Sequence, residues 1–210
     1  MLYLPNGIDL PAAAAAAPAR QGPPTALLLT RFVEFKPAQL VKIWGCVAVR
    51  LPAARLIVAG GALRDEARVA QRLLAAAGLG ATIEWLDTVA PSALPALYAR
   101  ANVALFPANA NRINRAKSAT RLADLLTAGV PVVASRIGEQ EAYMVDGETG
   151  LLTPPGDDRA LGEALADLLA DRARAQRMGQ AARRRMAEQF TWTKLAGKVE
   201  RLYEETLSAA

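Results

Sequence analysis

The chain has 210 residues, enough for one sizeable domain, and its 52% hydrophobic and 21% charged residues exclude a disordered chain. It has no histidine and one cysteine, Cys46, which argues against a zinc site, a Ser/His/Asp triad and an internal disulfide. The formal net charge of +5 favours an anionic partner. No apolar run reaches the roughly 18 residues of a membrane span, so we expect a cytoplasmic globular domain.

The beginning of the chain predicts a strand that runs into a turn at Asn6-Gly7. Pro11–Pro24 follows as an Ala/Pro-rich segment, in which proline recurs too often for a stable helix. The chain therefore divides into a hinge strand and linker (1–24), a main domain (25–189) and a C-terminal helix (190–210).

Short apolar strands alternate with amphipathic helices in the main domain. Strands are predicted at Ala26–Arg31, Arg55–Ala59, Thr82–Leu86, Asn102–Phe106, Pro131–Ala134 and Leu151–Thr153. Helices are predicted at Pro37–Val49, Arg64–Ala77, Ser92–Arg100, Ser118–Thr127, Gly138–Val145 and Asp158–Ser208, the last with breaks near Asp171 and Phe190. Because parallel strands need crossover connections, this alternation predicts an α/β fold: a single doubly wound parallel sheet with extra C-terminal helices.

The ends of the predicted strands nominate the binding sites, because ligands of such sheets bind outside the carboxyl ends of the strands. Arg31 and Lys36 place two permanent cations after the first strand, which suits a diphosphate; ordinary loop charge is the alternative. Gly60, after the second strand, lets a ligand approach the backbone or marks only a turn.

A polar segment after the fourth strand leads into a further helix. Ser118 is the predicted N-cap of that helix, whose free N–H groups would face a phosphate. Asp124, nearly two turns along, is suited to accept hydrogen bonds from the two hydroxyls of a ribose. A salt bridge to Arg121, three residues earlier, explains Asp124 equally well.

Taken in order, these elements resemble the C-terminal, donor-binding half of a group 1 (family 4) glycosyltransferase of the GT-B architecture. The likeness covers nearly the whole chain and implies a Rossmann-like sheet. It rests on Asn6–Asp9, Arg31 with Lys36, Arg55–Gly60, Leu94–Tyr98 with Ala101–Val103, Asp124–Ser135, Asp146–Leu152 with Pro154–Asp157, and Phe190–Trp192.

The resemblance implies that this half binds a nucleotide-diphosphate-sugar donor without a metal or another cofactor. Arg31 and Lys36 match the family's diphosphate clamp and are the implied catalytic residues, because they would stabilise the leaving group. Asp124 matches the ribose-binding acid, which is usually glutamate in the family. The other implied donor-site residues are Gly7, Gly60, Leu86, Lys117 and Ser118.

A second position, besides Asp124, departs from the family pattern. Ala116 stands where a second glutamate commonly faces the donor sugar, and the neighbouring Lys117-Ser118 pair resembles a variant branch of the family. Lys117 and the Ser118 backbone would then approach the phosphates or the sugar.

The implied reaction is retaining glycosyl transfer to a saccharide or lipid-linked acceptor. The acceptor site would belong to an N-terminal domain, separate or missing, to which the last helices cross back. The implied location is cytoplasmic, with contact at the inner face of the membrane as an option.

Three alternatives stay open at this point. The chain is a degenerate, non-catalytic binding module, in keeping with Ala116 and Asp124; or it is another nucleotide-sugar enzyme, such as an epimerase; or it binds nucleic acid or a membrane. The last would use the late arginines, among which no aromatic residues interleave for base stacking, so we expect no nucleic-acid partner. These arginines are Arg172, Arg174, Arg177, Arg183, Arg184 and Arg185.

Overall fold

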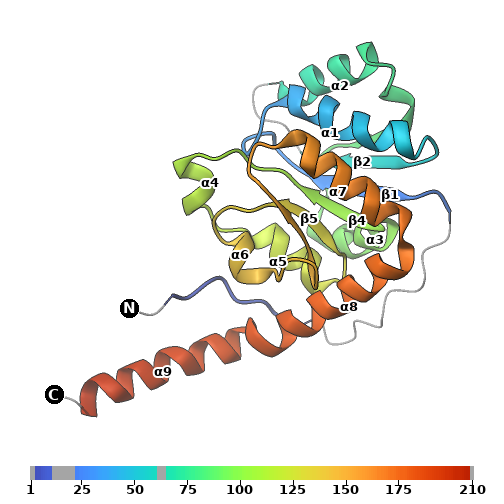
Figure 1. Cartoon of the computed structure of the whole chain (residues 1–210). Coiled ribbons are helices and arrows are strands. Elements are labelled where there is room, and N and C mark those ends of the chain that lie inside the picture. The colour runs from blue at the N-terminus through green and yellow to red at the C-terminus, as the bar shows by residue number, and fades with distance from the viewer. Residues whose placement is uncertain (1–2, 11–21, 61–64, 209–210) are drawn as a thin grey trace.

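Six parallel strands form one sheet in the computed structural model, which describes residues 3–10, 22–60 and 65–208 (Figure 1). Their order is β3-β2-β1-β4-β5-β6, so the direction of winding reverses between β1 and β4. The predicted doubly wound parallel sheet is confirmed. The strands are β1 (Thr25–Leu29), β2 (Arg55–Ala59), β3 (Ile83–Leu86), β4 (Val103–Phe106), β5 (Val132–Ser135) and β6 (Gly150–Thr153).

The helices follow the predicted alternation; several bounds differ by one or two residues, and two differences bear on the site. A short helix, α4 (Arg112–Ala116), was not predicted. It begins where the Asn111 side chain accepts a hydrogen bond from the Asn114 N–H (2.8 Å). The next helix begins at Thr120 rather than at Ser118. The helices are α1 (Pro37–Arg50), α2 (Glu66–Ala76), α3 (Leu94–Arg100), α4 (Arg112–Ala116), α5 (Thr120–Thr127), α6 (Gln140–Tyr143), α7 (Asp158–Ala170), α8 (Arg172–Gln189) and α9 (Trp192–Ser208).

Both faces of the sheet are covered, which explains why most residues of its strands are apolar. Alternate residues of one strand enter different cores: Leu28 packs on the side of α1, α2 and α7, and Leu27 on the side of α3, α5, α6 and α8. Trp44 of α1 lies fully buried in the first core, and its indole N–H donates to Thr82 Oγ1 (2.8 Å).

The beginning of the chain lies against its end. Within residues 3–10 the predicted hinge strand is reduced to one β-bridge, between Ile8 and Thr191. Gly7 is needed there, because a Cβ on it would lie 2.5 Å from the Trp192 ring. Most of the predicted linker (11–21) and the predicted helix start at Arg64 lie outside the described residues, as does Gly61, the neighbour of the nominated Gly60.

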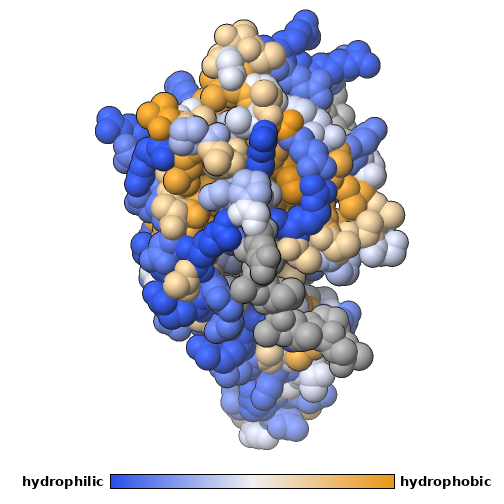
Figure 2. Space-filling model, turned by 90° about the vertical axis from the view of Figure 1, so that its right-hand side faces the viewer, coloured by the Kyte–Doolittle hydropathy of each residue, from blue (hydrophilic) through white to orange (hydrophobic). Residues whose placement is uncertain are grey.

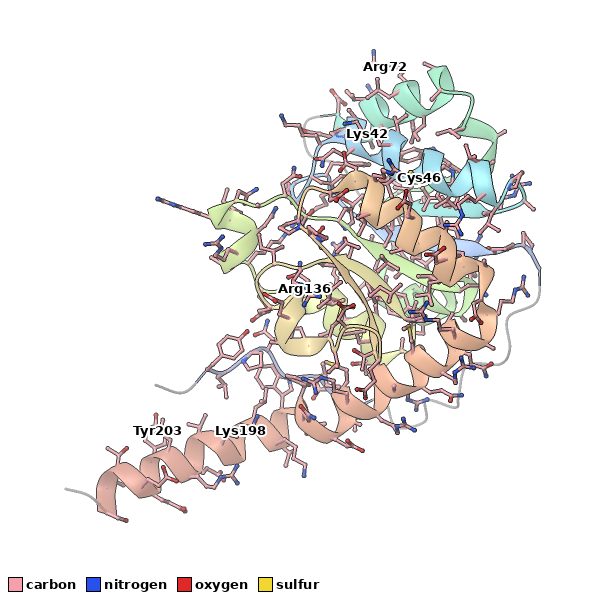
Figure 3. All side chains as sticks on the ribbon, viewed as in Figure 1. Lys42, Cys46, Arg72, Arg136, Lys198 and Tyr203 are labelled. Atoms are coloured by element: carbon pink, nitrogen blue, oxygen red, sulfur yellow. The ribbon has the colours of Figure 1, made fainter. Side chains whose placement is uncertain are left out.

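Helix α9 projects from the body of the molecule, carrying Lys198 and Tyr203 (Figures 1 and 3). Its contact with the body is small: Leu195 is buried, whereas Trp192, Leu202, Tyr203 and Leu207 are exposed. In the described part of the chain, no helix combines the length and the apolar character that crossing a membrane requires.

One of the late arginines has a structural role. Arg185 donates hydrogen bonds to the carbonyls of Ala142 and Tyr143, at 3.0 Å each, and its guanidinium lies 5.5 Å from the centre of the Phe190 ring. It thereby fastens α8 to α6.

Polar surface occupies the lower part of the face shown in Figure 2, with apolar residues higher up.

Replacing the buried indole tests the packing of α1 on the sheet. Trp44→Ala removes the largest fully buried side chain of that core and its hydrogen bond to Thr82. We expect it to lower the free energy of unfolding by about 3–5 kcal/mol in urea denaturation. Val49→Ala, on the same helix but exposed, is the control and should change it by less than about 0.5 kcal/mol. Equal effects of the two variants would contradict this packing.

Candidate functional site

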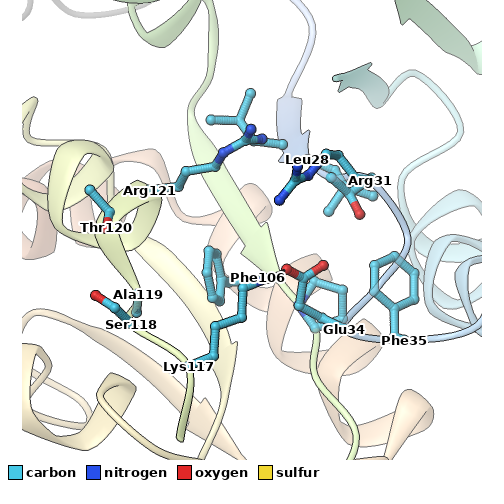
Figure 4. A pocket seen from close by; sticks show the side chains of 13 residues that line it. Leu28, Arg31, Glu34, Phe35, Phe106, Lys117, Ser118, Ala119, Thr120 and Arg121 are labelled. Carbon is cyan, nitrogen blue, oxygen red and sulfur yellow. Dashed lines mark hydrogen bonds and ion pairs between the residues drawn. The ribbon is translucent and has the colours of Figure 1, made fainter. Parts of the chain in front are cut away.

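A pocket of about 200 Å³ lies where the winding of the sheet reverses, at the carboxyl ends of β1 and β4 (Figure 4). Its walls come from the end of β1 and the loop that follows, from the end of β4, and from the beginning of α5. The lining residues are Leu28, Leu29, Thr30, Arg31, Glu34, Phe35, Phe106, Pro107, Lys117, Ser118, Ala119, Thr120 and Arg121.

The loop between β1 and α1 is held in an unusual backbone conformation. Phe32 has a φ of 55°, in the left-handed region that a bulky residue rarely adopts, and its N–H donates to Thr30 Oγ1 (2.8 Å). Its ring is buried and lies 5.4 Å, centroid to centroid, from the buried ring of Phe35. Both phenylalanines belong to the core, so the loop is anchored while Arg31 stays exposed at the pocket.

The loop after β4 is tied to the loop after β1 by a buried carboxamide. Asn114 Nδ2 donates to the carbonyls of Glu34 (2.8 Å) and Asn109 (2.9 Å), and the Asn109 N–H also donates to the Glu34 carbonyl (3.0 Å). The side chains of Gln39 and Asn109 add two reciprocal hydrogen bonds of 2.9 Å. Both walls of the pocket are therefore fixed relative to each other.

Charged groups meet in the pocket in two sets. Arg31 and Arg121 extend toward each other from opposite walls, and neither guanidinium forms a hydrogen bond or ion pair with a residue that the structure describes (Figure 4). Lys117 forms an ion pair with Glu34. Two cations without a carboxylate partner in one pocket repel each other unless an anion binds between them.

The expectation for the beginning of α5 was wrong in one respect. The N-cap is Ala119, which has no capping side chain, and its N–H donates to Glu139 Oε2 (2.7 Å). Ser118 Oγ instead accepts a hydrogen bond from Asn6 Nδ2 (2.5 Å). One N–H group that was expected to face a phosphate is therefore already bonded to the carboxylate of Glu139, the residue before α6. Ser118 lines the pocket but does not cap the helix.

Asp124 does not form the alternative salt bridge within the described residues, although Arg121 lies close enough to act on it electrostatically. Partial burial, which desolvates the ionised form, raises the pKa of the Asp124 carboxyl, and the Arg121 guanidinium opposes that shift without cancelling it. Burial, with a smaller contribution from Asp124, raises the pKa of the Tyr98 hydroxyl to about 12. Although the residue Asp124 as a whole is exposed, its carboxyl is desolvated enough for folding to disfavour the ionised form.

The other predicted site residues do not line this pocket. Lys36 is exposed at the start of α1, and its backbone N–H donates to Gln39 Oε1 (2.8 Å). Gly60 has a φ of 122°, and a Cβ there would lie 2.5 Å from the Thr30 carbonyl oxygen. The backbone conformation and this close approach are sufficient to explain the glycine without a ligand. Leu86 ends β3, and Gly7 packs on Trp192.

Glu34, Phe35 and Phe106 also line the pocket, although the sequence patterns did not single them out. Glu34 carried a usable signal, since it lies between Arg31 and Lys36 in the nominated loop. The two phenylalanines carried none, because apolar residues at strand ends are common. Among the described residues, no three side chains of the cysteine, aspartate and glutamate types cluster as metal ligands do.

The sheet order and the pocket define a doubly wound α/β domain with a cationic site at its switch point. The chain belongs to the glycosyl transferases group 1 family, whose model matches residues 14–185. The resemblance noted in the sequence is thus confirmed.

Individual relatives agree with this assignment. The chain is 30% identical over 209 residues to the GDP-mannose-dependent alpha-(1-6)-phosphatidylinositol monomannoside mannosyltransferase of Mycobacterium tuberculosis, covering 94% of this chain and 54% of that protein. The structure of sucrose-phosphate synthase from Thermosynechococcus elongatus matches with a TM-score of 0.71 at 26% identity, over 99% of this chain and 53% of that one.

A third match concerns the fold alone. Anabaena HepE, solved in complex with UDP and glucose, matches with a TM-score of 0.70 at 19% identity, over 90% of this chain and 49% of that one. The chain spans about half the length of all three proteins. Together they confirm the predicted Rossmann-like sheet of a GT-B C-terminal domain.

The carboxamide that ties the two loops can be tested by Asn114→Asp. The variant keeps the shape, but an ionised carboxylate cannot donate to the carbonyls of Glu34 and Asn109. We expect a loss of about 2–4 kcal/mol in the free energy of unfolding at pH 7, measured by urea denaturation. Arg112→Gln, exposed on α4, is the control. An unchanged stability of Asn114→Asp would contradict the proposed tie.

A second test uses pH. The pKa of Asp124 is raised above its ordinary value of 3.8, so folding favours the protonated form, and stability from this group is lost as the pH rises through the folded-state pKa. Asp124→Asn should therefore raise the free energy of unfolding at pH 7. The gain should vanish at pH values below the ordinary one, where wild type is protonated in both states. A gain that persists in acid would assign the effect to packing.

Proposed function

We propose that this chain supplies the donor-binding half of a retaining glycosyltransferase and binds a nucleotide-diphosphate sugar in the switch-point pocket. The observation that carries the proposal is the pair of guanidinium groups, Arg31 and Arg121, that line one pocket without a carboxylate partner among the described residues. Guanidinium groups bind phosphate oxygens through planar, bidentate hydrogen bonds. Family membership supports the same ligand class.

In the proposed reaction, the bond between the anomeric carbon and the terminal phosphate oxygen breaks while the acceptor oxygen forms a bond to that carbon on the same face. The proton of the acceptor hydroxyl passes to the departing phosphate oxygen. Negative charge grows on the departing diphosphate, and Arg31 and Arg121 stabilise it in the position they already hold. Lys36 lies outside the pocket and would act on a diphosphate only at its rim. Asp124 would accept hydrogen bonds from the two hydroxyls of the ribose. No metal or cofactor is part of the proposal.

The acceptor would bind outside the described residues, since the chain spans about half the length of the related mannosyltransferase. The related mannosyltransferase is named for a lipid-linked acceptor, phosphatidylinositol monomannoside. We place a saccharide or lipid-linked acceptor on a second, N-terminal domain, with the enzyme cytoplasmic and at the inner face of the membrane. The exposed apolar residues of α9, among them Trp192 and Tyr203, are where we place the contact between the halves.

The second candidate is a binding module without transferase activity. It is favoured by Ala116, which leaves the position of the family's second glutamate without a carboxylate. A module of this kind would bind the nucleotide sugar in the same pocket and release it unchanged, so binding alone does not separate the two candidates. The two candidates are separated by measuring whether the full enzyme transfers or hydrolyses the sugar.

Binding of nucleotides tests the pocket. UDP or GDP should raise the melting temperature of the chain, and the nucleosides uridine and guanosine should not, because they lack the phosphates. Arg31→Gln and Arg121→Gln should each weaken diphosphate binding by about tenfold to a hundredfold in calorimetric titration, since each removes a charge-assisted contact. Lys36→Gln should have a smaller effect.

Arg112→Gln is the matched control, because it removes the same charge from an exposed position on α4 outside the pocket. It should leave the affinity within a factor of about two. If no nucleoside diphosphate binds the wild-type chain, the proposed function is wrong. If the control weakens binding as much as Arg121→Gln does, the effect is one of overall charge and the pocket is misassigned.

A further inference from the structure

Glu34 is an unexpected residue in a pocket that would bind an anion. It is the one carboxylate among the described lining residues, which otherwise contribute the cations Arg31, Lys117 and Arg121. A carboxylate a few ångströms from a bound diphosphate repels it and weakens its binding. Its presence therefore needs a reason other than affinity for phosphate.

The structure holds Glu34 firmly in this position. Its carbonyl accepts hydrogen bonds from Asn114 Nδ2 (2.8 Å) and the Asn109 N–H (3.0 Å). Its side chain is 20% exposed and pairs with Lys117, whose side chain is 35% exposed. The pair is thus neutral as a unit, and the charge of Lys117 is largely cancelled before any ligand binds.

The pair and the two arginines occupy different parts of the pocket. In Figure 4 the guanidinium groups of Arg31 and Arg121 lie together, and Glu34 and Lys117 lie beside them toward the other end. A nucleotide sugar carries its nucleoside on one side of the diphosphate and its sugar on the other. The proposed ribose ligand, Asp124, lies further along α5 than Arg121, whereas Lys117 precedes that helix, so the sugar would point toward Lys117. A ligand whose diphosphate lies between the arginines therefore places its sugar close to the pair.

We propose that the Glu34–Lys117 pair binds hydroxyl groups of the sugar that is transferred, and that Lys117 is not part of the diphosphate clamp. A carboxylate accepts hydrogen bonds from two neighbouring hydroxyls and an ammonium group donates to a hydroxyl oxygen, so the pair satisfies both functions of a sugar hydroxyl. This inference rests on the proposed function, since it names the part of the donor that these residues recognise.

The test compares sugar nucleotides with the free diphosphates. UDP, UDP-glucose, GDP and GDP-mannose are titrated calorimetrically into wild type and Glu34→Gln. For the nucleotide that wild type binds, the variant should bind the free diphosphate as tightly or a few times more tightly, because a repelling charge is gone. It should bind the corresponding sugar nucleotide about ten times more weakly. The preference for the sugar nucleotide over the free diphosphate should fall.

Two further variants keep the outcome interpretable. Glu34→Asp retains the charge but withdraws the carboxylate by one methylene, so it should lose sugar-nucleotide affinity without any gain for the free diphosphate. Glu148→Gln removes an exposed carboxylate outside the pocket and should leave both affinities unchanged. Each variant is first checked for a cooperative thermal unfolding transition, which establishes that it is folded.

The outcomes separate this inference from the proposed function. If wild type binds neither UDP nor GDP, the proposed function fails and the inference fails with it. If wild type binds a diphosphate, but Glu34→Gln lowers the affinity for the free diphosphate as much as the affinity for the sugar nucleotide, then Glu34 only supports the loop. If Glu34→Gln leaves the preference unchanged, the sugar is recognised elsewhere. Either of the last two results overturns the inference and leaves the proposed function standing.

Discussion

The hydrogen bonds to the Glu34 carbonyl are the constraint on which the site depends. Parallel strands bring the ends of β1 and β4 to one edge of the sheet, but the loops that leave them would be free to separate. Asn114, buried between these loops, donates to the carbonyls of both. An unsatisfied buried carbonyl is costly, so the two loops keep a fixed spacing and hold their cations on opposite sides of one pocket.

Most of the fold could be predicted, and the reason is the period of its apolar residues. A sheet covered on both faces needs strands such as Leu56–Ala59, which are apolar throughout, and crossover helices between them. Because the topology brings the ends of β1 and β4 together, Arg31, Lys117 and Ser118 line the same pocket, and their role in binding stays a prediction. The reason for Gly60 could not be predicted from the topology, because it depends on how closely the Thr30 carbonyl approaches that glycine in space.

Contacts between distant parts of the chain account for what local patterns did not reveal. Ser118 has the chemistry of an N-cap, but Asn6, more than a hundred residues away, occupies its hydroxyl, and Glu139 takes the first N–H of the helix. The Glu34–Lys117 pair likewise joins residues 83 positions apart. A preference encoded in neighbouring residues is weak beside such contacts, and one sequence does not display them.

The arrangement separates the rigid part of the site from the part that can respond to a ligand. Phe32, Phe35 and Asn114 are buried and fully packed, so moving the backbone of either loop would break core contacts or expose their polar groups. Arg31 and Arg121 need no partner to be displaced before an anion enters. The Glu34–Lys117 pair is different, because a ligand that contacts either group must compete with the other. A sugar hydroxyl competes by replacing both halves of the interaction, whereas a bare phosphate would attract Lys117 and repel Glu34 at once. Selectivity for the sugar-bearing ligand would then arise from side-chain electrostatics on a fixed backbone.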